Sequence, residues 1–539
     1  MKKTILYITG LCCTVAASMS SCIEETFPTD SATSEQLGTR VENMLYAIPA
    51  AANRLNAQGG SQHYDWGYGS IMHIRDVMTE DMAIVSSGYD HYRSWSQNLA
   101  SVGESYATSQ FIWNFYWKFV QTSNDLIRAI NPDTDNDMQL GFLGVAKAFR
   151  AFQYLDLAQM FEFLENDKVT PNSPSGNSVL HLTVPIMTDS TSVDQSRNNP
   201  RVSREKMAAF ILSDLQAAEK DIPKFTATVK TMPHLDVVYG LYARYYMWLG
   251  DYANAKIYAH KAIDTTKSKP MTQSEWLSTS KGFNDISKWM WGSQLVAEDD
   301  VVQTGILNWT SWMSNETSFG YSSAGPWVMM NANTYNRMDD NDFRKLAWKA
   351  PEGGALNGLN DYIDPNSDAA LGMPAYSSLK FRPAEGNMDV SSIAAASAYP
   401  LMRVEEMYLI EAEAAAHINP AEGKELIESF MQTYRDPGYV CTPADVDGVV
   451  EEIVFQKRIE LWGEGLTYFD VKRLNMSVTR GYPGTNFTEA ACFNTTGRPA
   501  WMNFVIVQTE KNSNKAMMGY ENPSPAGVYT PWIDPSQKN

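Results

Sequence analysis

The sequence predicts a mainly α-helical protein: a tetratricopeptide-like scaffold of helical hairpins with long irregular loops and little β-structure. Three observations favour this class. Apolar residues recur with the period of a helix in several long segments, and one helix–turn–helix segment has the pattern of a tetratricopeptide repeat. Elsewhere Gly, Asn, Asp, Pro and Ser interrupt every apolar run. A chain of 539 residues can form one such body, because repeat folds grow by stacking.

The first 21 residues have the pattern of an export signal, here a lipoprotein signal peptide. Lys2 and Lys3 precede an apolar core that is too short to span a membrane. Small residues then lead to Cys22, as in a bacterial lipobox, so Cys22 is predicted to carry lipid chains that anchor the protein. An ordinary cleaved secretory signal is the alternative. Residues 22–38 are predicted to be a flexible tether.

Helical periodicity dominates the N-terminal half, residues 39–270. The clearest repeat is the hairpin 239–262, in which aromatic and small residues on two helices flank a turn at Gly250-Asp251. One hairpin cannot bury its apolar face alone, so we expect it to pack against the other helices. Ser203 is the predicted N-cap of one of them. The remaining predicted helices of this half are 41–55, 111–130, 144–163 and 206–222.

The C-terminal half, residues 271–539, is predicted to form one compact body with the first. Its residues 274–399 lack helical periodicity and read as long loops. A helix pair, 403–416 and 420–434, and a segment at 451–474 follow. The tail is irregular, with one apolar run, Phe504 to Val507, that is predicted to be a strand.

The segment 451–474 combines an apolar stripe with charged edges and a glycine break at Gly463-Glu464-Gly465. The glycine break can reverse the chain direction, so that the part after it lies beside the part before it. Charges on these two arms of the segment can then pair. We interpret these charges as a structural ionic latch; a catalytic carboxylate pair is the alternative. The predicted latch residues are Arg403, Glu406, Arg458, Glu460, Glu464, Asp470 and Arg473.

Composition and motifs exclude several function classes. A net charge of −19 and a pI near 4.9 argue against a nucleic-acid partner and against electrostatic adhesion to anionic lipid. The zinc motifs, the Gly-x-Ser-x-Gly elbow and the phosphate-binding loop are all missing from the sequence, so no enzyme, cofactor or metal is predicted.

Residues 339–342 (Asp-Asp-Asn-Asp) read as a solvated turn or a calcium site. Cys441 and Cys492 could pair or remain buried thiols.

Two loop regions are rich in aromatic residues set among Gly, Ser and Asn: Tyr64 to Trp95 and Trp289 to Trp327. Core packing accounts for many of these rings, but their number predicts that some form an exposed binding platform.

Two ordered blocks resemble the SusD/RagB-like family of outer-membrane nutrient-binding lipoproteins. The first is Arg403-x-x-Glu406, followed by Tyr408-Leu and Glu411-Ala. The second comprises Arg458, Glu460-Leu461, Glu464-Gly465, Asp470 and Arg473; Gly463 stands where the family often has a bulky residue.

The resemblance implies a surface lipoprotein that captures an extracellular nutrient, most often a glycan or oligosaccharide, and sits on a TonB-dependent (SusC-like) transporter barrel. Glu24 and Glu25 resemble the acidic tag that sends such lipoproteins to the outer face of the outer membrane. A peptide-binding member of the family, a secreted glycoside hydrolase and a pure scaffold or adhesin are the alternatives.

Relatives bind glycan through an aromatic arc drawn from an early and a middle loop. The resemblance therefore places the ligand site on exposed loop rings and nearby polar groups, whose replacement would lower ligand affinity rather than stability. The implied ligand-binding residues are Trp66, Arg75, Asp76, Tyr89, Tyr92, Trp95, Asn98, Trp309, Trp312 and Tyr321.

Overall fold

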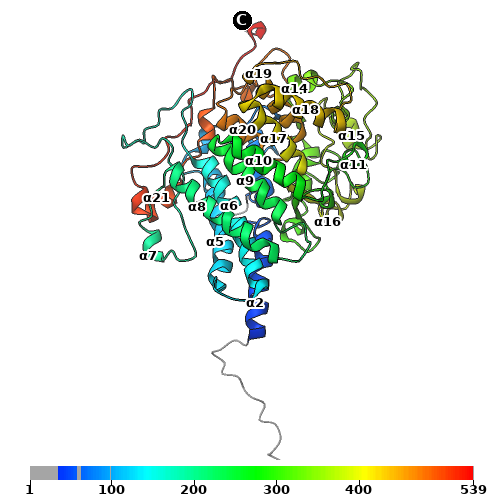
Figure 1. Ribbon diagram of the computed structural model, residues 1–539. Coiled ribbons are helices and arrows are strands. Elements are labelled where there is room, and N and C mark those ends of the chain that lie inside the picture. Colours follow the sequence, from blue (N-terminus) through cyan, green and yellow to red (C-terminus); the bar gives the residue numbers. More distant parts are fainter. Residues whose placement is uncertain (1–33, 58–61, 98, 538–539) are drawn as a thin grey trace, which may run out of the picture. The chain divides into compact units, whose positions relative to one another are not determined.

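The computed structural model describes residues 34–57, 62–97 and 99–537 (Figure 1). The predicted signal peptide, Cys22 and most of the predicted tether lie outside the described residues, as does Asn98. Residues 44–539 form one compact unit, and an N-terminal unit ends at Asn43, within helix α2 (Ser34–Ala51). The description below concerns the larger unit.

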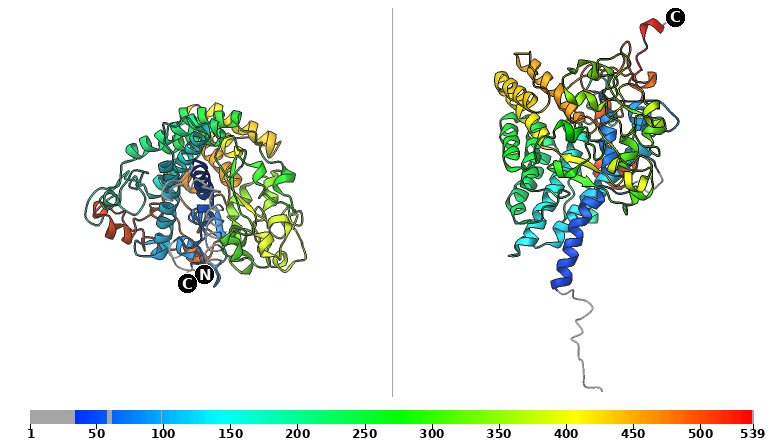
Figure 2. Two further views of the ribbon diagram at one scale, coloured as in Figure 1. Left: turned by 90° about the horizontal axis from the view of Figure 1, so that it is seen from below. Right: turned by 90° about the vertical axis from the view of Figure 1, so that its right-hand side faces the viewer.

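The scaffold is a series of long antiparallel helices, each packed on the next: α5 on α6, α6 on α8, α8 on α9, α9 on α10, α10 on α17, and α17 on both α18 and α19. The mainly helical prediction is confirmed. In the right-hand view of Figure 2, the cyan to yellow helices gather on one side and the irregular green-yellow segments on the other. The long helices are α5 (Ala107–Ala129), α6 (Asp137–Phe161), α8 (Arg204–Asp221), α9 (Leu235–Leu249), α10 (Tyr252–Thr265), α17 (Val404–Ile418), α18 (Pro420–Tyr434) and α19 (Val446–Glu460).

The predicted repeat is the hairpin α9–α10. Gly250 ends α9 with φ 72°, a left-handed conformation that costs glycine little, and the side chain of Asp251 caps α10. Ala243 and Ala255 are fully buried, and these small side chains let the two helices approach closely. The partner expected for this hairpin is α17, which lies about 140 residues further along the chain.

Short elements fill the regions between the long helices. The predicted N-cap Ser203 accepts a hydrogen bond from the backbone nitrogen of Lys206 at the start of α8. The short helices are α3 (Tyr68–Val77), α4 (Arg93–Ser96), α7 (Val193–Ser196), α11 (Gln273–Trp276), α12 (Asp300–Gln303), α13 (Trp309–Met313), α14 (Ala332–Arg337), α15 (Asp368–Gly372), α16 (Ser391–Ala394), α20 (Thr467–Arg473) and α21 (Gln508–Ser513).

The β-structure consists of two small antiparallel ribbons, and neither contains the strand predicted from the sequence. β1 (Met82–Ile84) pairs with β3 (Val328–Met330), and β2 (Trp291–Gln294) pairs with β4 (Ala398–Met402). The strand predicted at Phe504–Val507 is wrong: this run is buried, but its backbone belongs to no strand pair. Apolar character there reflects burial, which alone does not define a strand.

Helix α3 was not predicted from the sequence. It lies in the early stretch that reads as irregular. All ten of its residues are buried, the polar Ser70, His73 and Arg75 included, so its polar residues do not mark a side that faces water. The two cysteines, Cys441 and Cys492, are free buried thiols, which decides between the two alternatives for them.

Candidate functional site

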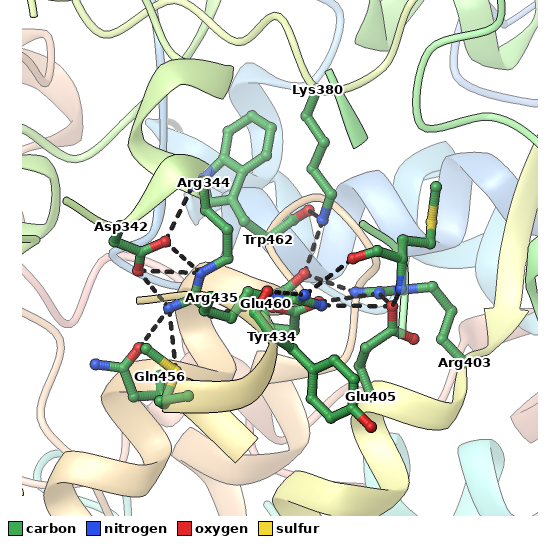
Figure 3. Close-up of polar contacts among 12 residues, drawn as sticks. Asp342, Arg344, Lys380, Arg403, Glu405, Tyr434, Arg435, Gln456, Glu460 and Trp462 are labelled. Carbon is green, nitrogen blue, oxygen red and sulfur yellow. Dashed lines mark hydrogen bonds and ion pairs between the residues drawn. The ribbon is translucent and has the colours of Figure 1, made fainter. Parts of the chain in front are cut away.

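Three of the predicted latch residues, Arg403, Glu460 and Glu464, lie in a buried cluster of eight charged residues, which we call the ionic cluster (Figure 3). Its centre is Glu460 at the end of α19. The carboxylate accepts hydrogen bonds from Arg435 (2.7 and 2.8 Å), Arg403 (3.0 Å) and Arg344 (2.9 Å), and all four side chains are fully buried. Four cations balance four acids: Arg344, Lys380, Arg403 and Arg435 against Asp342, Glu405, Glu460 and Glu464.

Electrostatics favour the charged form of Glu460. Burial alone would raise the pKa of its carboxyl, but the charges of Arg435, Arg403 and Arg344 hold that pKa well below its usual value. The ring of Trp276 lies 5.4 Å from the guanidinium carbons of both Arg403 and Arg435.

Glu464 completes the cluster. It accepts from Arg403 (2.8 and 3.0 Å) and from the Lys380 Nζ (2.8 Å), whose pKa burial lowers to about 8. Each carboxylate of the ionic cluster thus pairs with an arginine or lysine side chain and is buried away from any substrate. The geometry therefore favours the structural latch over the catalytic carboxylate pair.

The other predicted latch residues belong to separate pairs. Glu406 pairs with Arg244 of α9 (2.6 and 2.7 Å) and does not contact Arg403 among the pairs described. Arg458 pairs with residues outside the segment 451–474, namely Glu80 and Asp81 (2.6 Å to each). The first pair ties α17 to α9 of the repeat hairpin, and the second ties α19 to the residues just before β1.

The two arms of the segment 451–474 do pair, but through a residue that the sequence analysis missed. Lys457 of α19 contacts Asp470 of α20 (2.7 Å) and Glu413 of α17 (2.9 Å), and Arg473 contacts Asp470 (2.6 Å) and Glu413. The family blocks did not include Lys457, and its sequence neighbours, Gln456 and Arg458, are polar, so the local pattern gave no sign that it is buried.

The glycine break has a steric cause. Gly463 (φ 78°) and Gly465 (φ 68°) adopt left-handed conformations, and a Cβ at Gly463 would lie 2.3 Å from the ring of Phe381. The Gly465 nitrogen donates to both oxygens of Asp76 (3.1 and 3.0 Å). The bulky residue common in the family at position 463 would not fit this chain without a shift of Phe381.

Most residues implied for ligand binding lie in the core. Arg75 bonds Asp156 (2.8 Å) and the hydroxyl of Tyr68 (2.9 Å), and Asp76 holds Gly465. Both therefore serve helix packing around α3. The role of these residues in ligand binding stays a prediction, but the predicted exposure is wrong for Tyr321, which is 8 % exposed, and for five further aromatic residues, which are 0–2 % exposed. They are Trp66, Tyr92, Trp95, Trp309 and Trp312.

One group of aromatic residues lies at the surface, and we call it the aromatic lip: Tyr89 is exposed, His63 and His91 are half-buried, and Tyr321 is 8 % exposed beneath them. His63 stacks on His91 (centroids 4.2 Å apart), and the edge of His91 meets Tyr321 at 5.3 Å. Tyr89, which is 57 % exposed, lies 6.3 Å from Tyr321.

Buried aromatic rings pack beneath the lip. Tyr321 stacks face to face on the buried Trp312 (4.3 Å, 14°), and Trp312 meets Tyr92 edge-on at 4.8 Å. The early and middle loops meet here: Tyr89, His63 and His91 form the surface, and Tyr321 and the implied tryptophans lie buried beneath it. His63 and its contact with Tyr321 could not be found from sequence, because 258 residues separate the two.

The lip is suited to binding neutral ligands. Burial, with smaller contributions from His63 and Arg93, lowers the pKa of His91 to about 4, so its imidazole is neutral at neutral pH. The exposed ring of Tyr89 and the neutral imidazole of His91 lie together at this surface.

In the part of the chain that the structure describes, no cluster of three or more His, Cys, Asp or Glu side chains could hold a metal ion. No described helix combines the length and the apolar character needed to cross a membrane.

The structure is a helical repeat scaffold with a buried ionic cluster and an aromatic group at its surface. Residues 313–531, which contain both signature blocks, match the model of the SusD family. The match identifies residues 313–531 with the SusD/RagB family, a family of binding proteins and not of enzymes.

Solved structures from Bacteroides species have the same fold. A SusD-like carbohydrate-binding protein from Bacteroides vulgatus matches 91 % of this chain and 99 % of its own at 22 % identity, with a TM-score of 0.70. A SusD superfamily protein from Bacteroides thetaiotaomicron matches 90 % and 99 % at 18 % identity (TM-score 0.67). A SusD-like carbohydrate-binding protein from Bacteroides fragilis matches 89 % and 98 % at 15 % identity (TM-score 0.63). No curated protein sequence matches the chain.

Proposed function

We propose that this protein is a lipid-anchored receptor on the outer face of the outer membrane, which binds an extracellular glycan and delivers it to a partner TonB-dependent transporter. The observation that carries the proposal is the aromatic lip. Sugar rings present C–H faces that stack on tyrosine, and Tyr89 offers an exposed ring beside the packed pair of Tyr321 and Trp312. The relatives from Bacteroides vulgatus and Bacteroides fragilis are described as carbohydrate-binding, which supports a glycan as the ligand.

Replacing the lip rings is expected to weaken glycan binding without unfolding the protein. Tyr89→Ala and His91→Ala should each raise the Kd about tenfold or more, because ring stacking contributes about 1–3 kcal/mol by analogy with aromatic stacking on bases. A glycan and peptide array identifies the ligand, and titration calorimetry measures the affinity. Tyr106→Ala, at an exposed ring outside the lip, is the matched control. Unchanged affinity in both lip variants would place the ligand elsewhere, and a peptide ligand would favour the alternative member of the family.

Anchoring and partnership are tested together in cells. Cys22→Ala should release the protein from the membrane fraction and remove the lipid increment from its intact mass, because acyl chains supply about 0.8 kcal/mol per buried CH₂. Mild-detergent extraction of the wild type should co-purify a large β-barrel transporter. An unlipidated wild-type mass, or extraction of the free monomer alone, contradicts the corresponding half of the proposal.

A further inference from the structure

The surface loop 351–359 contains the one Asn-Gly pair of the sequence, Asn357-Gly358. Both residues are exposed. In the described part of the chain, no atom beyond the neighbouring residues lies within 4 Å of the position that a Cβ on Gly358 would take. Because glycine has no side chain, nothing shields its backbone nitrogen from the amide of the preceding asparagine. The pair is therefore open both to water and to an attack of this nitrogen on the Asn357 side chain.

The local turn leaves the two reacting groups free. Leu359 donates its backbone N–H to the backbone oxygen of Leu356 (3.1 Å), which closes a β-turn around Asn357 and Gly358. Gly358 has φ 78°, as the third residue of a type II turn requires. Among the described residues, neither the side-chain amide of Asn357 nor the nitrogen of Gly358 has a hydrogen-bond partner. The bond that closes the turn contributes only about 0.5–1.5 kcal/mol, so a small local movement can bring the two groups together.

The loop is fixed at its base by Asn360. The side chain of Asn360 donates to the backbone oxygens of Leu346 (2.9 Å) and Trp348 (2.8 Å) and accepts from the backbone nitrogen of Ala350 (3.3 Å). Asn357 takes no part in these bonds. A chemical change at Asn357 should therefore leave the rest of the fold intact.

A second exposed asparagine, Asn366, lies in a protected setting. The nitrogen of the residue after it, Ser367, donates to the backbone oxygen of Asp364 (3.2 Å). The Ser367 side chain also caps α15 by accepting from the nitrogen of Ala370 (3.1 Å). Both asparagines are exposed, so the free following nitrogen is what distinguishes Asn357.

We propose that Asn357 is a site of spontaneous deamidation in the folded protein. The nitrogen of Gly358 forms a bond to Cγ of Asn357, the bond between Cγ and Nδ2 breaks, and Nδ2 leaves as ammonia with the proton of the Gly358 nitrogen. Water then opens the cyclic imide. Breaking the bond between the ring nitrogen and Cγ gives an aspartyl residue, and breaking its bond to the main-chain carbonyl carbon gives an isoaspartyl residue. Either product adds a negative charge to the loop, because a carboxyl group is ionised at neutral pH.

Peptide mapping by mass spectrometry tests the site. The full-length protein is aged in mildly alkaline buffer at body temperature, once folded and once in denaturant. The peptide that contains Asn357 should gain the mass difference between O and NH in both samples. Its folded and denatured rates should agree within about tenfold, because opening the turn breaks one hydrogen bond. At Asn366 the folded rate should fall more than about tenfold below the denatured rate, because the Ser367 bond and the α15 cap must both break.

Asn357→Gln is the matched variant, because its longer side chain would have to close a larger ring. It should show no conversion at this position over the same period, and its melting temperature should equal that of the wild type. The aged wild type should also keep its melting temperature, since the bonds of Asn360 are unchanged. The proposal is overturned if the folded protein keeps Asn357 intact while the denatured chain is converted. It is equally overturned if folding protects Asn357 as strongly as Asn366, or if the glutamine variant is converted as fast as the wild type.

Discussion

Glu460→Gln is expected to destabilise the protein by about 3–5 kcal/mol or to prevent folding altogether. The substitution keeps the shape of the side chain but removes the negative charge that Arg344, Arg403 and Arg435 share at 2.7–3.0 Å. Three fully buried guanidinium groups would then lose their common counter-charge, and leaving a buried charge uncompensated costs about this much. Chemical denaturation followed by circular dichroism measures the free energy of unfolding.

The matched control is Glu451→Gln on the same helix. Glu451 is exposed and lies 3.9 Å from Arg337, so its loss should change the free energy of unfolding by less than about 1 kcal/mol. Equal effects of the two substitutions would refute the central role of Glu460. Acid should act in the same direction as Glu460→Gln. Because the folded-state pKa of Glu460 is depressed, its contribution to stability is present above the pKa of the unfolded state and is lost as the pH falls towards the folded value.

Trp309→Ala is expected to lower the free energy of unfolding by about 3–5 kcal/mol, as other large-to-small core substitutions do. Trp309 is completely buried, with its ring stacked on Tyr399 (5.1 Å) and edge-on to Phe381 (5.1 Å). This outcome reverses the expectation from sequence, in which the ring is an exposed contact and its loss spares stability.

Tyr89→Ala provides the comparison, because Tyr89 is 57 % exposed and its removal leaves no core cavity. Thermal unfolding of both variants distinguishes the two situations. A melting temperature for Trp309→Ala equal to that of the wild type, together with weaker glycan binding, would restore the original assignment and contradict the buried position.

The amino-acid sequence by itself determined the class of fold and the family. Helical periodicity, the cap at Ser203, the Gly250-Asp251 turn and the two signature blocks are each contained within a few tens of residues. Such patterns express local geometry, and local geometry is decided by neighbours along the chain. The α9–α10 hairpin and the helices around it could therefore be predicted closely.

Only the tertiary structure decided which charge pairs with which and which rings face water. Arg344 meets Glu460 across 116 residues, and Arg458 meets Asp81 across 377. An aromatic residue in a Gly- and Asn-rich loop can pack into the core, as Trp309 does, or stand at the surface, as Tyr89 does. Both outcomes have the same local sequence pattern, because burial depends on contacts between segments that the order of residues does not bring together.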